Sequence, residues 1–238
     1  MNKSNRKAAF RLYLILGGLF IALLVACNLI FQKFFHWTPL GFLAGSEDSI
    51  FNYTFEISVG ILPYPLTFLI TDIISEIYGR KKANLVVVSG LFASVVVFGI
   101  VWLSQIAPAT DWSPVDDRQF EHVFGRTGIA VGASMAAYLL AQFIDIRIFH
   151  FWKKLTKGKH LWLRNNFSTW TSQFIDTFVV LALLCSAGAI EWELFAALLF
   201  NGVLFKVIVA ALDTPFLYLS TYLIRKRFKL KMGEEISL

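Results

Sequence analysis

Five ionisable side chains stand inside long apolar stretches of this sequence. Asp72, Asp145, Asp176 and Asp213 fall in four such stretches, and Lys206 shares the last of them with Asp213. A charged side chain is costly in hydrocarbon, so such residues persist where they pair, line a wet cavity or bind a ligand. Structural ion pairing through Lys206 could neutralise one aspartate, but the other carboxyl groups would still need protons, cations or a ligand. The set therefore predicts a polar cavity between helices.

Three amide side chains accompany these acids. Gln142 and Gln173 each lie three residues before an aspartate, so each amide shares a helical face with its carboxylate. Carboxylates with amides disfavour an anionic substrate and suit a ligand with adjacent N–H donors and a carbonyl, as on a guanine edge. The candidate substrate-binding set is Asn28, Asp72, Gln142, Asp145, Gln173, Asp176, Lys206 and Asp213.

The elements that hold these residues are predicted to be membrane helices. The 238-residue chain is 57% hydrophobic and 16% charged, with mean hydropathy +0.63, whereas a soluble domain is about a quarter charged. Six stretches are long enough to span a hydrocarbon core of ~30 Å, and in lipid their backbones must be helical. They are 12–34, 57–79, 84–105, 127–151, 168–188 and 194–224. The predicted fold class is all-α, a polytopic membrane protein with six transmembrane helices.

Charges in the connecting segments predict the orientation. Basic residues cluster in the N-terminal tail, in the second and fourth loops and in the C-terminal tail. The alternate loops are acidic, with Glu47 and Asp48, then Asp116 and Asp117, then Glu191 and Glu193. The positive-inside rule places both termini in the cytoplasm. The same distribution explains the net charge of +6 without a nucleic-acid partner. The predicted divisions are a cytoplasmic tail 1–11, a six-helix transmembrane domain 12–225 and a cytoplasmic tail 226–238.

Several chemistries find no support in the sequence. Cys27 and Cys185 are isolated, so neither a disulfide framework, a metal site nor a thiol oxidase is predicted. We expect no metal and no cofactor. Two aspartates at one depth could form the dyad of an intramembrane aspartic enzyme, but the sequence motifs of such enzymes are missing. We therefore expect that the protein is not an enzyme.

Three prolines interrupt two of the predicted helices. Pro63 and Pro65 fall in the second helix, and Pro215 falls in the last. Proline removes a backbone donor, so each site is either a tolerated kink or a break whose freed groups face a substrate cavity.

Small residues at four-residue spacing mark the first helix. Gly18, Ala22 and Ala26 form a ridge that lets another helix approach closely. We expect it to pack inside the bundle; a docking face for a second copy or a coupling subunit is the alternative.

Three segments together resemble the queuosine precursor transporter family, which is grouped with vitamin uptake transporters. They are the run from Thr71-Asp72 through Glu76 to Gly79-Arg80, the tetrapeptide Gln-Phe-Ile-Asp at 142–145 and again at 173–176, and Phe205-Lys206-Val207. The resemblance covers roughly 12–225. It implies a bacterial inner-membrane importer of 7-deazaguanine compounds, namely the cyano or aminomethyl base or queuine, which feed tRNA modification. By position, seven candidates match the family's polar residues: Asn28, Asp72, Gln142, Asp145, Gln173, Asp176 and Lys206. Asp213 and Glu76 match less uniformly.

The residues then receive hypothetical roles. Asp176 or Asp145 would bind the N–H edge of the base, helped by Gln142 and Gln173, while Lys206 neutralises a carboxylate. Asp72 would meet a cationic aminomethyl group or carry a proton. Glu76 lies near the inner interface, where snorkelling explains it equally well. A proton-coupled carrier, facilitated diffusion and the substrate-binding subunit of an energy-coupling-factor importer all stay open.

Overall fold

The computed structural model describes residues 3–31, 33–38, 53–125, 127–186, 188, 190–231 and 233–237. For Phe34, Glu56, Gly125 and 127–134 it describes the backbone alone. The predicted acidic pair Glu47 and Asp48 lies outside the described residues.

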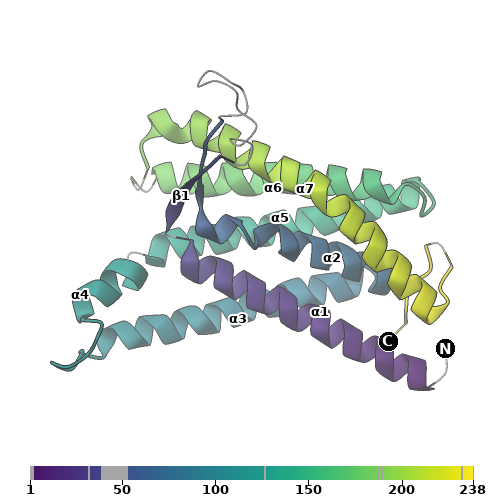
Figure 1. Ribbon diagram of the computed structural model, residues 1–238, viewed down its shortest axis with the longest axis horizontal. Coiled ribbons are helices and arrows are strands. Elements are labelled where there is room, and N and C mark those ends of the chain that lie inside the picture. The colour runs from purple at the N-terminus through teal and green to yellow at the C-terminus, as the bar shows by residue number, and fades with distance from the viewer. Residues whose placement is uncertain are drawn as a thin grey trace.

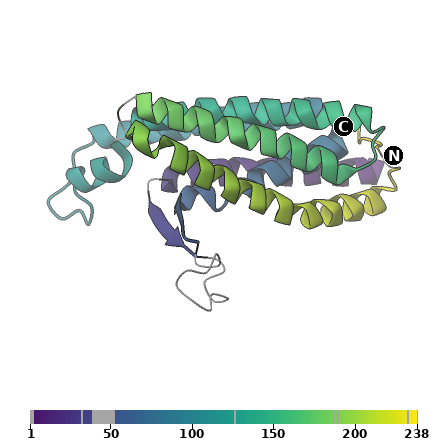
Figure 2. The ribbon, with the colours of Figure 1, turned by 90° about the horizontal axis from the view of Figure 1, so that it is seen from above.

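Long helices running along one another make up most of the described chain (Figures 1 and 2). They are α1 Lys3–Ile30, α2 Tyr64–Tyr78, α3 Arg80–Ile106, α5 Thr127–Leu155, α6 Leu161–Ser186 and α7 Trp192–Phe228. A short helix, α4 Asp117–Phe120, and a π turn, Glu121–Gly125, connect α3 to α5. An antiparallel hairpin of β1 Phe34–Trp37 and β2 Phe55–Ser58 precedes a 3-10 turn, Val59–Ile61. The fold is therefore all-α apart from this hairpin.

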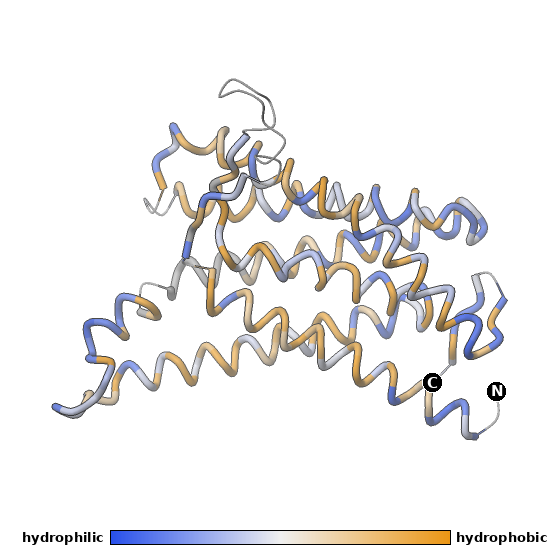
Figure 3. The backbone as a smooth tube through the Cα atoms, in the orientation of Figure 1, coloured by the Kyte–Doolittle hydropathy of each residue, from blue (hydrophilic) through white to orange (hydrophobic). Residues whose placement is uncertain are grey.

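Five segments are long and apolar enough to cross a membrane. They are Lys3–Ile30, Val59–Tyr78, Arg80–Ile106, Leu161–Ser186 and Trp192–Phe228. Helix α5 stands where the fourth span is predicted, but it is not among the five in the described residues, so six spans stay a prediction. Hydrophobic residues cover the length of α1 and α3, while hydrophilic residues gather at the ends (Figure 3). Exposed side chains such as Phe92, Ile100 and Leu103 give α3 a lipid-facing surface. The chain is a multi-pass membrane protein.

The basic segments meet at one end of the bundle. The start of α1 and the C-terminal segment lie at the same end (Figures 1 and 2). There the backbone N–H of Ile236 donates to the carbonyl of Ile77, 2.7 Å away, and Gly233 approaches Gly158. The α2–α3 and α5–α6 connections therefore lie at the same end of the bundle as the two chain ends, while α4 and the end of α6 lie at the opposite end. Which end faces the cytoplasm stays a prediction.

Helix α2 is the central element of the bundle. It contacts α1, α3, α5 and α7, and its apolar residues Phe68, Ile73, Ile74 and Ile77 are all buried. Because neighbours surround the helix, its polar side chains also face protein rather than lipid.

The predicted second helix, 57–79, is wrong over its first residues. Residues up to Ser58 belong to β2, a 3-10 turn follows, and α2 begins only at Tyr64. Pro63 is the residue before the helix and Pro65 lies in its first turn, where a missing N–H costs nothing. Here the prolines start a helix instead of kinking one. Pro215, in contrast, lies inside α7, which continues past it.

The small-residue ridge of α1 does not pack inside the bundle. Gly18, Ala22 and Ala26 are all exposed, and a Cβ added at Gly18 would meet nothing within 4 Å. Gly17 is buried instead, with Val86 beside it. The expected internal packing is wrong, and the ridge faces outward.

Candidate functional site

A buried ion pair joins α6 to α7. Lys206 Nζ lies 2.7 Å from Asp176 Oδ2, with the aspartate 4% and the lysine 6% exposed. Both residues sit on long helices that pack along each other, so the rigid helix backbones fix the pair in place. The other carboxylate oxygen, Asp176 Oδ1, has no hydrogen-bond partner among the described residues. The Tyr64 side chain also lies close to this carboxylate, so Asp176 Oδ1 is an acceptor within reach of both Tyr64 and a ligand.

Two further groups surround the ammonium of Lys206. It donates to Thr177 Oγ1 at 3.0 Å and stands 4.7 Å from the centre of the Tyr64 ring. Such a cation over an aromatic face is stabilised by ~2 kcal/mol or more when desolvated. Tyr64 is the first residue of α2, so the late start of that helix brings the ring to the ion pair.

A cavity of about 220 Å³ opens beside this ion pair. Asp176, Thr177 and Lys206 form its polar side, and the hairpin and 3-10 turn close another side through Ile57, Ser58 and Gly60. The remaining lining residues come mainly from α1, α6 and α7: Cys27, Asn28, Phe31, Ile61, Tyr64, Val180, Leu181, Leu184, Ile190, Leu198 and Gly202. Its size is below the roughly 300–1,000 Å³ of pockets for drug-sized ligands, which fits a small flat molecule.

A smaller cavity of about 10 Å³ adjoins the first through Lys206. Asp72, Gln173 and Asp213 line it, together with Asn165 and other residues of α2, α6 and α7. Gln173 is 2% exposed, and its Oε1 has no partner among the described residues. The structure therefore brings four of the predicted residues, Asp72, Gln173, Lys206 and Asp213, around one point.

Asp72 also faces Asp145, across the contact between α2 and α5. Their side chains lie within hydrogen-bonding reach of each other, and Asp72 is 1% and Asp145 0% exposed. Ser172 on α6 donates to Asp145 Oδ1 at 3.0 Å. Asp145 lines neither of the two cavities just described. The predicted aspartates thus divide between a cavity, at Asp176, and a closed contact, at Asp145.

Gln142 belongs to the packed interior. Its Nε2 donates to Tyr138 Oη at 2.8 Å, and its Oε1 accepts from Thr71 at 3.3 Å. Both ends of this fully buried amide are therefore used within the protein. The two copies of the Gln-Phe-Ile-Asp tetrapeptide consequently differ, since Gln173 faces a cavity and Gln142 does not.

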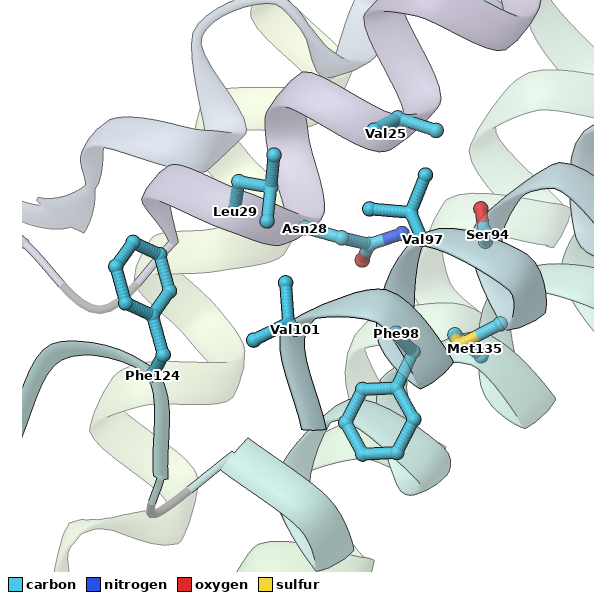
Figure 4. Close-up of a pocket in the computed structure, with 9 residues that line it drawn as sticks. All are labelled: Val25, Asn28, Leu29, Ser94, Val97, Phe98, Val101, Phe124 and Met135. Atoms are coloured by element: carbon cyan, nitrogen blue, oxygen red, sulfur yellow. The ribbon is translucent and has the colours of Figure 1, made fainter. Parts of the chain in front are cut away.

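Asn28 borders two kinds of space. It lines the cavity of about 220 Å³ beside the ion pair, and it also lines an apolar cavity of about 30 Å³ between α1 and α3. Figure 4 shows its amide among Val25, Val97 and Ser94, inside this apolar cavity. Among the predicted residues, Asn28 is the one placed at the rim of the site.

Glu76 anchors a second ionic cluster, near the basic end of the bundle. Its carboxylate lies 2.6 Å from Arg164 and 3.6 Å from Lys153, and Arg225 also contacts it. Glu76 is 2% and Arg164 1% exposed, so the snorkelling interpretation of Glu76 is wrong. Lys153 further pairs with Glu235 of the C-terminal segment at 2.8 Å. The cluster ties α2, α5, α6 and α7 together.

Several residues of the site are not predicted from the sequence. Tyr64 and Thr177 look like ordinary interfacial residues, and Arg164 looks like one more loop cation. One signal was available on α6, where small polar residues recur on the face that carries Gln173 and Asp176: Asn165, Ser168, Thr169 and Ser172. All four are buried, so this polar stripe marks the side of α6 that faces the bundle interior.

Comparisons with known proteins find a matching family and two relatives. A family model described as "Putative vitamin uptake transporter" matches residues 58–220, which leaves α1 and Asn28 outside the match. A Bacillus subtilis protein named "Probable queuosine precursor transporter" is 25% identical over 162 residues, 68% of this chain and 70% of that protein. A Haemophilus influenzae protein of the same name is 27% identical over 161 residues, 66% of this chain and 65% of that protein.

No solved structure matches this chain at a significant level. The family match, however, covers well over half of the chain and contains α2, α6 and all but the end of α7. It also contains the ion pair, both cavities' polar sides and the facing aspartates. The resemblance drawn from the sequence motifs is thereby confirmed, and the chain belongs to the vitamin uptake transporter family, a family of transporters rather than enzymes.

Proposed function

We propose that this protein imports queuosine precursors of the 7-deazaguanine class across a bacterial inner membrane. The names of its two relatives support the substrate class. The cavity beside Asp176 and Lys206 would hold the base. The helix bundle would expose this cavity to one side of the membrane and then to the other. The preferred compound would be the cyano or aminomethyl base, or queuine.

One observation carries this proposal: a charge pair with spare hydrogen-bonding capacity lies beneath an aromatic ring at a small cavity. Asp176 Oδ1 is an unpartnered acceptor in the described structure and suits the N–H edge of a guanine-like base. Lys206 uses two of its three N–H groups on Asp176 and Thr177, which leaves one for a ring carbonyl. The Tyr64 ring offers a stacking surface worth ~1–3 kcal/mol per base.

Uptake can be read directly from tRNA. Cells that lack this protein and cannot make the base receive each deazaguanine at low concentration, and queuosine in their tRNA is measured. Expression of the wild-type chain should restore queuosine. Asp176→Asn and Lys206→Ala should lower uptake by about tenfold or more, because ~1.4 kcal/mol of lost binding is a tenfold effect and either change leaves a buried partner unpaired.

A matched control is Glu193→Gln, which makes a similar charge change on an exposed residue at the start of α7. It should behave as the wild type, with all variants present in the membrane at similar amounts. Full uptake by Asp176→Asn and Lys206→Ala would refute this placement of the substrate. No queuosine in cells that express the wild-type chain would refute the substrate class.

The second candidate is the substrate-binding subunit of an energy-coupling-factor importer. The outward-facing ridge of Gly18, Ala22 and Ala26 favours it, because small residues allow a partner helix to approach. ATPase subunits that co-purify with the full chain would support this version. The aspartic-enzyme alternative loses its support, because Asp145 is completely buried and a hydrolytic dyad must reach substrate and water.

A further inference from the structure

The facing aspartates of α2 and α5 form a site of their own. Lys206 is paired with Asp176, and Arg164 is paired with Glu76. Neither Asp72 nor Asp145 has a salt bridge among the described residues, although Arg164 and Glu76 lie near enough to influence Asp72. Each of these two buried cations therefore already has a carboxylate partner, although Glu76 also pairs with Lys153 and Arg225.

Hydroxyl groups surround the pair, and other charges lie beyond them. Ser172 donates to Asp145, and Ser168 and Thr169 also approach it from α6. Lys206 and Asp213 of α7 share the small cavity with Asp72. Asp72 Oδ1 and Asp145 Oδ2 are buried without a hydrogen-bond partner in the described structure. A buried polar atom without a partner is costly, so a set of them indicates a missing guest.

A proton is the guest that fits. Two carboxyl groups in direct contact in a buried site cannot both be negative, because the repulsion between like charges is strong there. A proton between them removes one charge and supplies the hydrogen bond. A Ca²⁺ or Mg²⁺ ion would need six or more oxygen ligands and a space of its own, whereas Asp145 borders neither described cavity.

We propose that Asp72 and Asp145 bind one proton and that its movement drives substrate import. This inference rests on the proposed function for the transport step, but the proton site itself does not depend on the substrate. Asp72 lines the small cavity beside Lys206, and it also faces Asp145. The small cavity shares Lys206 with the proposed substrate cavity, so Lys206 links the two sites.

The proton site can be tested without substrate. In the infrared spectrum of the purified full-length protein in lipid, the wild type should show the carbonyl stretch of a protonated carboxyl group at neutral pH. The difference from the double variant Asp72→Asn/Asp145→Asn should contain this band, because two facing amides hold no such proton. Asp176→Asn should keep the band, since Asp176 is paired with Lys206. An unchanged band in the double variant would overturn the proposal.

Coupling is tested in vesicles that contain the full chain, with radiolabelled 7-cyano-7-deazaguanine as the probe. One proton per substrate predicts about tenfold accumulation per pH unit of an inward proton gradient. The double variant should show no accumulation, and Glu193→Gln should match the wild type. Accumulation driven by sodium and indifferent to pH would contradict the coupling. If the wild type moved no probe while the infrared band were present, the substrate proposal would fail and the proton site would stand.

Discussion

Glu76 is the residue on which most of the second ionic cluster, near the basic end of the bundle, depends. Its two carboxylate oxygens serve Arg164, Arg225 and Lys153, and Arg164 is itself fully buried. Without the glutamate, a buried guanidinium would lose its counter-charge in a low-dielectric interior. Breaking such a pair by removing one partner costs about 3–5 kcal/mol, which is more than the pair contributes against an apolar replacement.

Glu76→Gln should therefore lower the thermal stability of the protein markedly. The expected loss is about 3–5 kcal/mol, because the amide keeps the shape of the carboxylate and removes its charge. The measurement is the melting temperature of the purified protein in detergent. Glu193→Gln, the same change on an exposed residue, should leave the melting temperature within about one degree, since exposed sites contribute little. Equal melting temperatures for both variants would contradict this account of the cluster.

At this scale, the sequence predicted residue types better than residue partners. A charge in an apolar stretch is visible in one dimension, so Asp72, Asp145, Asp176 and Lys206 stand out. Their pairing depends on the rotation of each helix, which the sequence leaves open. Gln142 and Gln173 stand in identical tetrapeptides, yet they face different surroundings. Arg164 was hidden because a basic residue near a loop has an ordinary explanation.

The predicted second span, which consists of the end of β2, a 3-10 turn and α2, shapes the cavity. The hairpin, the 3-10 turn and the first residue of α2 all contribute lining side chains. Phe55 and Ile57 of β2 pack against Phe205 of α7, next in sequence to Lys206. Ser58 accepts from the backbone N–H of Gly60 at 3.1 Å and donates to the carbonyl of Phe31. The turn is thus held against α1 at the edge of the site.

Gly60 permits this close contact between the turn and α1. A Cβ there would stand 2.7 Å from the carbonyl oxygen of Cys27 and 2.9 Å from Cα of Phe31, and backbone atoms cannot move aside easily. Gly60→Ala should cost about 1–3 kcal/mol, as overpacking usually does, and should weaken substrate uptake because the cavity wall shifts.

Gly18→Ala is the matched control, since nothing lies within 4 Å of an added Cβ at that exposed helical position. Alanine favours a helix over glycine by ~1 kcal/mol, so this variant should melt at the same temperature or higher. The comparison uses melting in detergent together with queuosine in tRNA. A Gly60→Ala protein as stable and active as Gly18→Ala would show that the turn does not fix the wall.

The sequence predicted the existence of this break but not its form. Two prolines close together signalled an interruption, and both a kink and a cavity-facing break fitted them. The form depends on β2, which ends just before the 3-10 turn and Pro63. Its partner β1 precedes it in the sequence by a long connection that includes residues 39–52. Pairing between segments that distant along the chain leaves no local signal.

The whole molecule stacks three polar layers along the bundle. Tyr64, Asp72 and Glu76 mark them on α2, and a rise of ~1.5 Å per residue separates the first two by roughly 12 Å and the last two by roughly 6 Å. The cavity beside Asp176 and Lys206 comes first, the facing aspartates second and the ionic cluster last, at the basic end. The C-terminal segment lies over that end through Glu235 and Ile236.

Composition predicted the general class of this architecture, because long apolar stretches admit few structures in lipid. The predicted spans at 84–105 and 194–224 agree with α3 and α7, which extend further at both ends. The layers themselves were not predictable, since they arise from side chains on four different helices. Six of the eight predicted residues line two adjoining cavities, while Gln142 and Asp145 line neither.

Direct binding tests this central division most simply. Radiolabelled 7-cyano-7-deazaguanine is titrated onto the purified full-length protein, and its affinity is compared between the wild type, Asp176→Asn and Glu193→Gln. With a substrate site at the Asp176–Lys206 pair, Asp176→Asn should weaken binding by about tenfold or more, while Glu193→Gln should bind as the wild type does. Equal affinity for all three proteins would contradict a substrate site at the Asp176–Lys206 pair.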